Sequence, residues 1–554
     1  MKPMKIKQLI FLIVTALLAI GCNTLDTKID TEITGDNLNT NFRYLFDMGY
    51  SPYIQIRSGF SHLDNNIAAP MSDEAEQTAS TSDSQTFNNG SWSPYNNPDD
   101  VYNNCYAGIR AAYFFLDNSE DYENKLALNR DTISDNGYQY HLDVAEIAWL
   151  RAEAQVLIAW YYFELIKRYG SVPYVDRVLS FNEETNLPRT DYPEIVDEIV
   201  AKIDLVADQL QTSWKAYDSQ RDGRFTKGAA LALKSRILLY AASPRDNPGN
   251  DKQKWEKAAQ AAYDVIQLGQ YSLGTNYRSL FLEGNSATDP EIIMSMRGGS
   301  SNSLEKANYP IATPGGNSGV TPSHNLVAAY EYTGTPDPDD PYANRDPRLA
   351  YSVVTNNSQW NGRTIEIWQG GTDSWDNINA SKTGYYLKKF LIENLYLTQN
   401  ESRIHNWVMF RYAEILLNFA EAMNEAYGPD EDNGYGLTAR EAVNMVRSRP
   451  GVDMPDVEAS SVTEMRERIK HERRIELAFE GHRFFDLLRW KDAEYALNQP
   501  LKGIRAVKQG DNSFTYTEFN VENRIFITPK MYYYPIPQVE INKSKNLLVQ
   551  NEGW

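Results

Sequence analysis

The 554-residue chain has few residues suited to metal and disulfide chemistry, with two cysteines and six histidines. Two cysteines allow one disulfide at most. His471-Glu472 begins like the zinc motif HExxH, but Ile475 stands where the second histidine is needed. The chain also lacks a dinucleotide-binding glycine motif, a P-loop and a G-x-S-x-G nucleophile elbow. These absences argue against zinc-dependent, nucleotide-dependent and serine-hydrolase enzymes.

Positive charge is also scarce, since 54 Lys and Arg face 74 Asp and Glu, for a net charge of −20. Wrapping nucleic acid requires a positive surface, so we predict no nucleic-acid partner. The same excess argues weakly against uronic-acid or sulfated ligands. At physiological salt this repulsion decays over about 8 Å.

Long hydrophobic runs are absent except at the N-terminus, where residues 9–20 follow three lysines. The run is shorter than the ~20 residues that span a bilayer and is typical of a signal peptide. It ends in a small residue before Cys22, which resembles a bacterial lipobox. We therefore predict a lipoprotein signal peptide at 1–21 and lipidation of Cys22, which leaves Cys105 unpaired. Ordinary secretory cleavage near this point is the alternative.

Several segments have the 3.6-residue period of amphipathic helices. Alanines on their buried stripes allow helices to stack closely as antiparallel pairs. The segment from Trp255 to Tyr271 resembles a tetratricopeptide unit, although no clean repeat recurs. We predict a predominantly α fold with a tetratricopeptide-like helix-pair scaffold. The expected helices cover 99–118, 138–169, 194–210, 227–243 (capped by Thr226), 255–268, a stretch from about 408, 438–447, and 462–480 continuing through Trp490.

Residues 288–407 differ in composition, because they are rich in Gly, Pro, Ser, Asn and Asp. They also contain runs in which polar and apolar residues alternate, such as TIEIW. We expect a large loop-rich insertion with short β-strands that faces the ligand, because loops on a rigid scaffold concentrate binding residues. The predicted organisation is the signal peptide, an N-terminal helical part (22–287), this insertion, and C-terminal helices with a tail (408–554).

Two groups of acidic residues are candidates for a catalytic or a metal-binding site. Glu472, Glu476 and Glu480 share one helix face with arginines interleaved, which favours a salt-bridged helix over the acid/base pair of a glycosidase. Prolines interrupt the cluster of Asp337, Asp339 and Asp340, so it is not an EF-hand. We predict no cofactor and no catalytic residue. A loosely bound structural calcium ion at the three aspartates remains an open alternative.

The segment ERRIELAFEGHRFFDLLRW (472–490) and the tail YYYPIPQVEINKSKNLLVQNEGW (532–554) resemble the SusD/RagB family. The segment from Ser91 to Asn118 is similar to that family's first helical block. The resemblance implies an outer-membrane lipoprotein exposed on the surface of a Bacteroidetes-type Gram-negative cell. It also implies a non-catalytic protein that binds oligosaccharides and passes them to a TonB-dependent, SusC-like barrel transporter.

Sugars have apolar faces, which flat aromatic rings cover, and polar edges, which amides, carboxylates and arginines bind. Trp92, Trp360, Trp368 and Trp375 lie in Gly/Asn/Ser-rich segments, so we predict that they are exposed glycan contacts. The alternative is that each pins its own loop.

The family resemblance implies further glycan-site residues: Asp73 and Asn96 together with Trp92, then Tyr95 and Arg57, and finally Tyr309. For Asp73 the alternative is a helix cap or a loop salt bridge. Three other functions remain open: a peptide-binding lid of a peptide importer, a glycoside hydrolase, and a structural lid without its own ligand.

Overall fold

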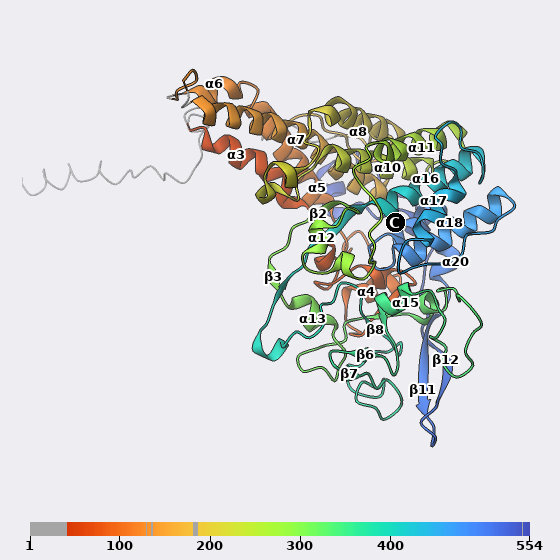
Figure 1. Ribbon diagram of the computed structural model, residues 1–554. Helices are drawn as coiled ribbons and strands as arrows, with labels where there is room; N and C mark the ends of the chain where they lie inside the picture. The colour runs from red at the N-terminus through yellow and green to blue at the C-terminus, as the bar shows by residue number, and fades with distance from the viewer. Residues whose placement is uncertain (1–40, 129, 135–136, 181–186, 546) are drawn as a thin grey trace, which may run out of the picture.

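The computed structural model in Figure 1 describes residues 41–554, apart from 129, 135–136, 181–186 and 546. The predicted signal peptide and Cys22 therefore lie outside the described residues. Helices gather at the top of Figure 1, whereas the loops and short strands lie below them.

The helical layer is a row of packed neighbours. Helix α5 packs on α7, α7 on α8, α8 on α10, α10 on α11 and α11 on α16, and α16 contacts both α17 and α18. This stacking confirms the predicted predominantly α, tetratricopeptide-like scaffold. The row consists of α5 (Tyr102–Asn118), α7 (Tyr138–Tyr169), α8 (Tyr192–Val206), α10 (Lys227–Ala242), α11 (Lys252–Gln267), α16 (Tyr412–Tyr427), α17 (Ala439–Arg447) and α18 (Val462–Glu476).

Shorter helices surround this row. They are α3 (Arg43–Tyr50), α4 (Asp83–Asn88), α6 (Tyr122–Ala127), α9 (Trp214–Tyr217), α12 (Asn285–Thr288), α13 (Ser303–Asn308), α14 (His324–Val327), α15 (Arg348–Ser352), α19 (Arg483–Trp490), α20 (Ala493–Leu497) and α21 (Gln538–Lys543).

Local sequence signals account for several helix ends. The Thr226 hydroxyl accepts a hydrogen bond from the backbone N–H of Ala229 at 3.2 Å, so the predicted cap of α10 is confirmed. Helix α7 has its predicted bounds and ends before Gly170, whose φ of 70° suits glycine. Helix α11 begins at Lys252, ahead of the predicted Trp255, because the Asp251 side chain caps it.

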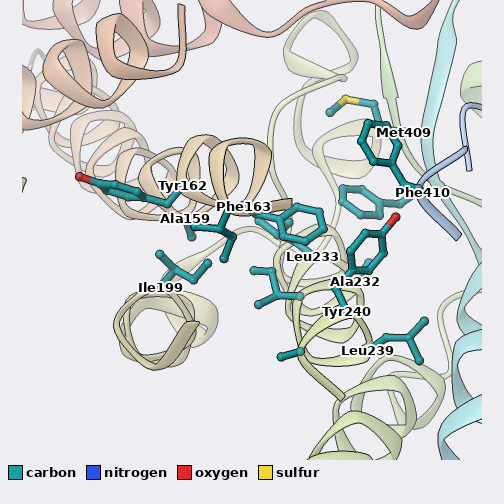
Figure 2. Packing of buried hydrophobic residues seen from close by; sticks show 14 of the residues in the cluster. Ala159, Tyr162, Phe163, Ile199, Ala232, Leu233, Leu239, Tyr240, Met409 and Phe410 are labelled. Carbon is teal, nitrogen blue, oxygen red and sulfur yellow. The ribbon is translucent and has the colours of Figure 1, made fainter. Parts of the chain in front are cut away.

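The main core lies between these helices. Figure 2 shows side chains of α7, α8 and α10 converging with Met409 and Phe410, and the rings of Phe163 and Tyr240 meet edge to face at 5.2 Å. Small residues bring the helices close. A Cβ on Gly108 of α5 would lie 2.3 Å from a ring carbon of Tyr161 on α7, so a larger residue there would push the helices apart.

The predicted short strands of 288–407 are confirmed. They form two-stranded antiparallel pairs, and their loops enclose a second hydrophobic core. The strands up to residue 411 are β1 (Ala75–Gln77) paired with β4 (Val320–Pro322), β2 (Ile292–Met296) with β10 (Trp407–Arg411), β3 (Ser300–Ser301) with β9 (Arg403–Ile404), β5 (Val353–Val354) with β8 (Tyr386–Leu387), and β6 (Gln359–Trp360) with β7 (Arg363–Thr364).

One expectation for the C-terminal part was wrong. A helix was expected from about Val408, but β10 occupies that position and α16 begins at Tyr412. Hydrogen bonding to β2 decides the conformation there. The residues after α20, for which the sequence patterns predict no strand, form β11 (Leu501–Lys508) and β12 (Phe514–Glu522), an antiparallel hairpin that projects downward in Figure 1.

A buried ion network joins the loop region to α18. The Glu476 carboxylate accepts hydrogen bonds from Arg411 at 2.6 Å, from Arg348 at 2.8 Å and from Arg449. Glu291 in turn pairs with Arg411 at 2.7 Å and with Arg449 at 2.9 Å. All five side chains have at most 1% of their surface exposed.

Neighbouring carboxylates extend the network. Glu472 pairs with Arg447 at 2.9 Å and also with Arg348, and Glu480 pairs with Lys389 at 2.8 Å. Glu472 and Glu476 thus lie on a salt-bridged helix, as predicted, whereas the placement of Glu480 on the same helix was wrong, because α18 ends at Glu476. All three carboxylates find cationic partners on other segments rather than among the arginines interleaved with them.

Replacing Glu476 with Gln should strongly destabilise the protein. The change leaves buried arginines without a counter-charge, so we expect the free energy of unfolding to fall by about 3–5 kcal/mol. Glu467→Gln is the matched control on the same helix, because that side chain is 66% exposed and should cost about 1 kcal/mol or less. Urea unfolding of both variants measures the difference. Similar losses in the two would contradict the assigned role of the network.

Candidate functional site

A groove with a volume of about 1510 Å³ lies between α18, α19, α20, α14 and the β11–β12 hairpin. We call it the α18 groove. Polar and charged side chains converge on it from segments far apart in the sequence, as expected of a ligand site. Those used below are Asp73, His324, Lys470, His471, Arg474, Arg483, Asp492, Tyr495, Gln499, Lys502 and Glu518.

The floor of the α18 groove is an aspartate held by two arginines. Arg474 Nη2 lies 2.7 Å from Asp73 Oδ2, and Arg483 donates from Nε to Oδ1 at 2.8 Å and from Nη2 to Oδ2 at 3.0 Å. Burial alone would raise the pKa of the Asp73 carboxyl, but the two guanidinium groups hold it well below its usual range. Asp73 is therefore ionised at neutral pH.

The backbone around Asp73 is fixed by a strand pairing. Ala75 of β1 lies opposite Pro322 of β4, and the Ser323 hydroxyl donates to the Asp73 carbonyl at 2.5 Å. The loop region thus carries Asp73 to α18 and α19, which supply the arginines. The salt bridge that was the predicted alternative role of Asp73 is present, and it lies inside the groove.

The walls of the groove offer an exposed ring and polar groups. Tyr495 on α20 is 76% exposed, and Gln499 after that helix is also exposed. Opposite them, the His324 imidazole contacts the Tyr385 hydroxyl at 2.8 Å and lies 3.3 Å from Glu518 on β12. A flat ring beside hydrogen-bonding groups is the chemistry that sugar recognition needs.

Of the predicted site residues, only Asp73 lines the α18 groove. Tyr95 is 83% exposed and Asn96 is exposed, but they form a small turn whose Pro94 carbonyl accepts a hydrogen bond from the N–H of Gln538, the first residue of α21. Arg57 pairs with Asp99 at 3.0 Å. The structure does not bring these residues together with Asp73.

The prediction that Trp92 is exposed was wrong, because its side chain is 2% exposed. It lies among the rings of Phe87, Tyr534 and Trp554, whose centroids are 4.9, 5.0 and 4.6 Å away. The C-terminal tail folds back over the Trp92 segment and buries the indole. Trp92 thus pins its loop, which was the stated alternative.

The same correction applies to Trp360 and Tyr309, which are 1% and 0% exposed. Their rings meet edge to face at 5.8 Å within the second core, and the Tyr309 hydroxyl donates to the Ile392 carbonyl. Loops rich in Gly and Asn still need apolar anchors when they fold into a core of their own, and these two rings are such anchors.

Trp368 and Trp375 are half-buried against the β11–β12 hairpin. The Arg505 guanidinium lies 4.5 Å from the Trp375 ring and 4.4 Å from the Phe519 ring, and Lys508 lies 4.8 Å from the Trp368 ring. These cation–π contacts cover part of each ring. A glycan-binding role for the two tryptophans stays a prediction, at a patch separate from the α18 groove.

Sequence reasoning missed Tyr495, Arg474 and Arg483 as site residues. Tyr495 sits in a short helical pattern that gives no sign of exposure. The two arginines belong to the segment 472–490 and were assigned only to salt bridges. The doubled Arg473-Arg474 offered a weak signal, since Arg473 pairs inward with Asp486 at 3.1 Å while Arg474 faces the groove.

Asp337, Asp339 and Asp340 are exposed, and across the described ranges no group of three or more His, Cys, Asp or Glu residues could hold a metal ion. The absence of a cofactor stays a prediction. In the same part of the chain, no helix combines the length and apolarity needed to cross a bilayer. The Cys105 thiol is buried and free.

Two family models match this chain in separate segments. The model described as "SusD family" matches residues 290–554, and the one described as "Starch-binding associating with outer membrane" matches residues 25–239. SusD-like protein P38 of Formosa agariphila is 27% identical over 371 residues, which cover 64% of this chain and 68% of that protein. SusD-like protein P25 of the same organism is 25% identical and covers 73% and 74%.

Solved structures agree over nearly the whole length. A SusD-like protein from Bacteroides fragilis superposes with a TM-score of 0.75 at 28% identity, covering 94% of this chain and 99% of that one. A laminarin-binding SusD-like protein has the same fold, with a TM-score of 0.62 at 21% identity and coverages of 93% and 100%. Family models, curated relatives and fold therefore agree, and the chain belongs to the SusD-like family.

Proposed function

We propose that the protein binds an oligosaccharide in the α18 groove and breaks no bond in it. The observation that carries this proposal is the groove itself, about 1510 Å³ in volume, with the exposed ring of Tyr495 beside convergent polar side chains. The carbohydrate-binding descriptions of the starch-binding family model and the laminarin-binding relative support it.

The expected affinity is low enough for a protein that binds a glycan and then releases it. A tyrosine ring that covers ~100 Å² of a sugar face contributes roughly 2.5 kcal/mol before ordering costs. Asp73, Gln499 and Lys502 can bond hydroxyl groups along the edge of the sugar. The sum corresponds to roughly millimolar to micromolar affinity, which permits rapid release.

The acids of the site support a non-catalytic role. A glycosidase needs two facing carboxyls, one of which keeps a proton near neutral pH. Asp73 is held ionised by two arginines, and Glu472, Glu476 and Glu480 are buried in the ion network. Glu74 beside Asp73 keeps its proton, because its pKa is raised to about 8, but it is 1% exposed and does not line the groove. These carboxyls are therefore not placed to act as a general acid on a sugar in the groove.

The lining of the groove favours sugar over peptide. Peptide capture by strand addition requires an exposed row of backbone N–H and C=O groups along the site. Lys502 and Glu518 are the strand residues in the lining, and they contribute side chains, whereas the remaining lining residues belong to helices and loops.

We further propose that lipid on Cys22 anchors the protein to the outer membrane, facing outward, and that it passes its glycan to a SusC-like barrel transporter. The lipobox-like sequence before Cys22 supports the anchor, and the family model associated with the outer membrane supports the location. Weak, reversible binding in the groove is compatible with such a transfer.

Replacing Tyr495 with Ala should weaken glycan binding by roughly tenfold or more, because a stacking surface is lost. Tyr396→Ala is the matched control, since Tyr396 is 66% exposed but lies outside the groove lining. Calorimetry with a ligand found on a glycan array measures both variants. Unchanged affinity for Tyr495→Ala would refute stacking on this ring.

Replacing Cys22 with Ala should release the protein from membranes, because no acyl chain can then be attached. Fractionation of cells that express the wild-type and Cys22→Ala chains measures the distribution, and Cys105→Ala serves as the control for loss of a thiol. A Cys22→Ala chain that still sediments with membranes would contradict the lipid anchor.

A further inference from the structure

The floor of the α18 groove has more positive than negative charge. Arg474 and Arg483 face the single carboxylate of Asp73. The adjacent Glu74 does not cancel the excess, because burial and then the nearby Asp73 raise the pKa of its carboxyl to about 8. Glu74 accepts a hydrogen bond from the N–H of Phe479 at 3.2 Å and is protonated at neutral pH. Two cations thus meet one anion.

The two arginines also have donors left over. Their bonds to Asp73 use Nη2 of Arg474, together with Nε and Nη2 of Arg483. Nε of Arg474 is buried and has no hydrogen-bond partner among the described residues. A buried donor of a charged group without a partner is costly. The side chains of Arg474 and Arg483 keep 18% and 12% of their surface exposed, so an oxyanion in the groove can reach the guanidinium groups.

The other charged side chains of the groove either form ion pairs or are exposed to solvent. Lys470 pairs with Asp492 at 2.7 Å, and Lys502 pairs with Glu518 at 3.0 Å. Glu458 and Glu464 on the rim are exposed, so salt screens them. The positive excess is therefore concentrated at the partly buried floor.

We infer that the ligand of the α18 groove is an acidic glycan, whose carboxylate or sulfate ester binds Arg474 and Arg483 beside Asp73. Guanidinium groups bind such planar or tetrahedral oxyanions through paired, charge-assisted hydrogen bonds. Asp73 holds both arginines in place and repels a second anion, so the floor takes one acidic group. The inference rests on the proposed function and specifies its substrate class.

The net charge of −20 had argued weakly against acidic ligands. Screening at physiological salt limits the reach of each charge to about 8 Å, so the net charge of the whole chain does not set the potential at the floor. The nearest charges therefore decide binding at the floor, and they are the two guanidinium groups and one carboxylate.

The test compares matched pairs of oligosaccharides by calorimetry on the full-length chain. The carboxylate arm uses galacturonate, mannuronate and glucuronate oligosaccharides with their carboxyl-reduced forms, and the sulfate arm uses sulfated and desulfated galactans. We expect the acidic member of at least one pair to bind about tenfold or more tightly than its neutral partner. The arm that shows this preference identifies the anion.

Arg474→Gln should abolish most of that preference, because one of the two guanidinium groups that bind the anion is lost. Asp73 keeps its two bonds to Arg483 in this variant. Arg466→Gln is the matched control, because it removes one charge from the same helix at a side chain that is 34% exposed and lies outside the groove lining, and it should keep the preference.

Each result is decisive. A preference that Arg474→Gln abolishes and Arg466→Gln retains supports the inference. Neutral and acidic forms that bind equally overturn the inference and leave the proposed function intact. A preference that survives in Arg474→Gln also overturns it. Failure of every neutral and acidic glycan in the two arms to bind overturns the proposed function as well.

Discussion

The buried charges of α18 are the constraint on which the rest of the structure depends. Glu472 and Glu476 point into the interior, where an unpaired carboxylate is prohibitively costly. Their cations come from Arg348 in the loop region, Arg411 at the end of β10 and Arg449 after α17. The loops must therefore fold onto α18 before its charges are neutralised, which couples the two hydrophobic cores into one structure.

The same helix positions the α18 groove. Because side chains three or four residues apart share a face, Glu472 and Glu476 face the network while His471 and Arg474 face the groove. Arg473 takes a third direction and pairs with Asp486 of α19. A rigid, fully paired network behind α18 thus holds Arg474 in place at the floor. The position of Arg474 in the groove is therefore fixed by the ion pairs behind α18 rather than by the loops that line the groove.

Sequence patterns predicted the helical frame because its signals are local. The Thr226 cap and the apolar stripes of α8 and α11 depend on residues within a few turns of one another. The strand at Trp407–Arg411 pairs with Ile292–Met296, far away in the sequence, so no local signal marks it. The hairpin of 501–522 is a local pairing, and it was missed because the sequence analysis found patterns only in the helices before it and the tail after it. Among the residues of the α18 groove, only Asp73 was predicted, through the family resemblance. Arg474 could not be assigned to the groove from the sequence, because its contact with Asp73 joins residues 401 positions apart.

Burial was the property that composition could not decide. Trp92 and Trp360 lie in loops as polar as those of Trp368 and Trp375, yet the first pair is buried and the second is half-exposed. The difference arises from what folds over each loop: Trp554 of the tail covers Trp92, and the second core encloses Trp360. Tyr495 stays exposed because α20 packs inward through Ala493 and Leu497, which leaves Tyr495 on the outer side of the helix. The segments that fold over each loop, rather than the number of aromatic residues, therefore decide which rings stay exposed and can contact a ligand.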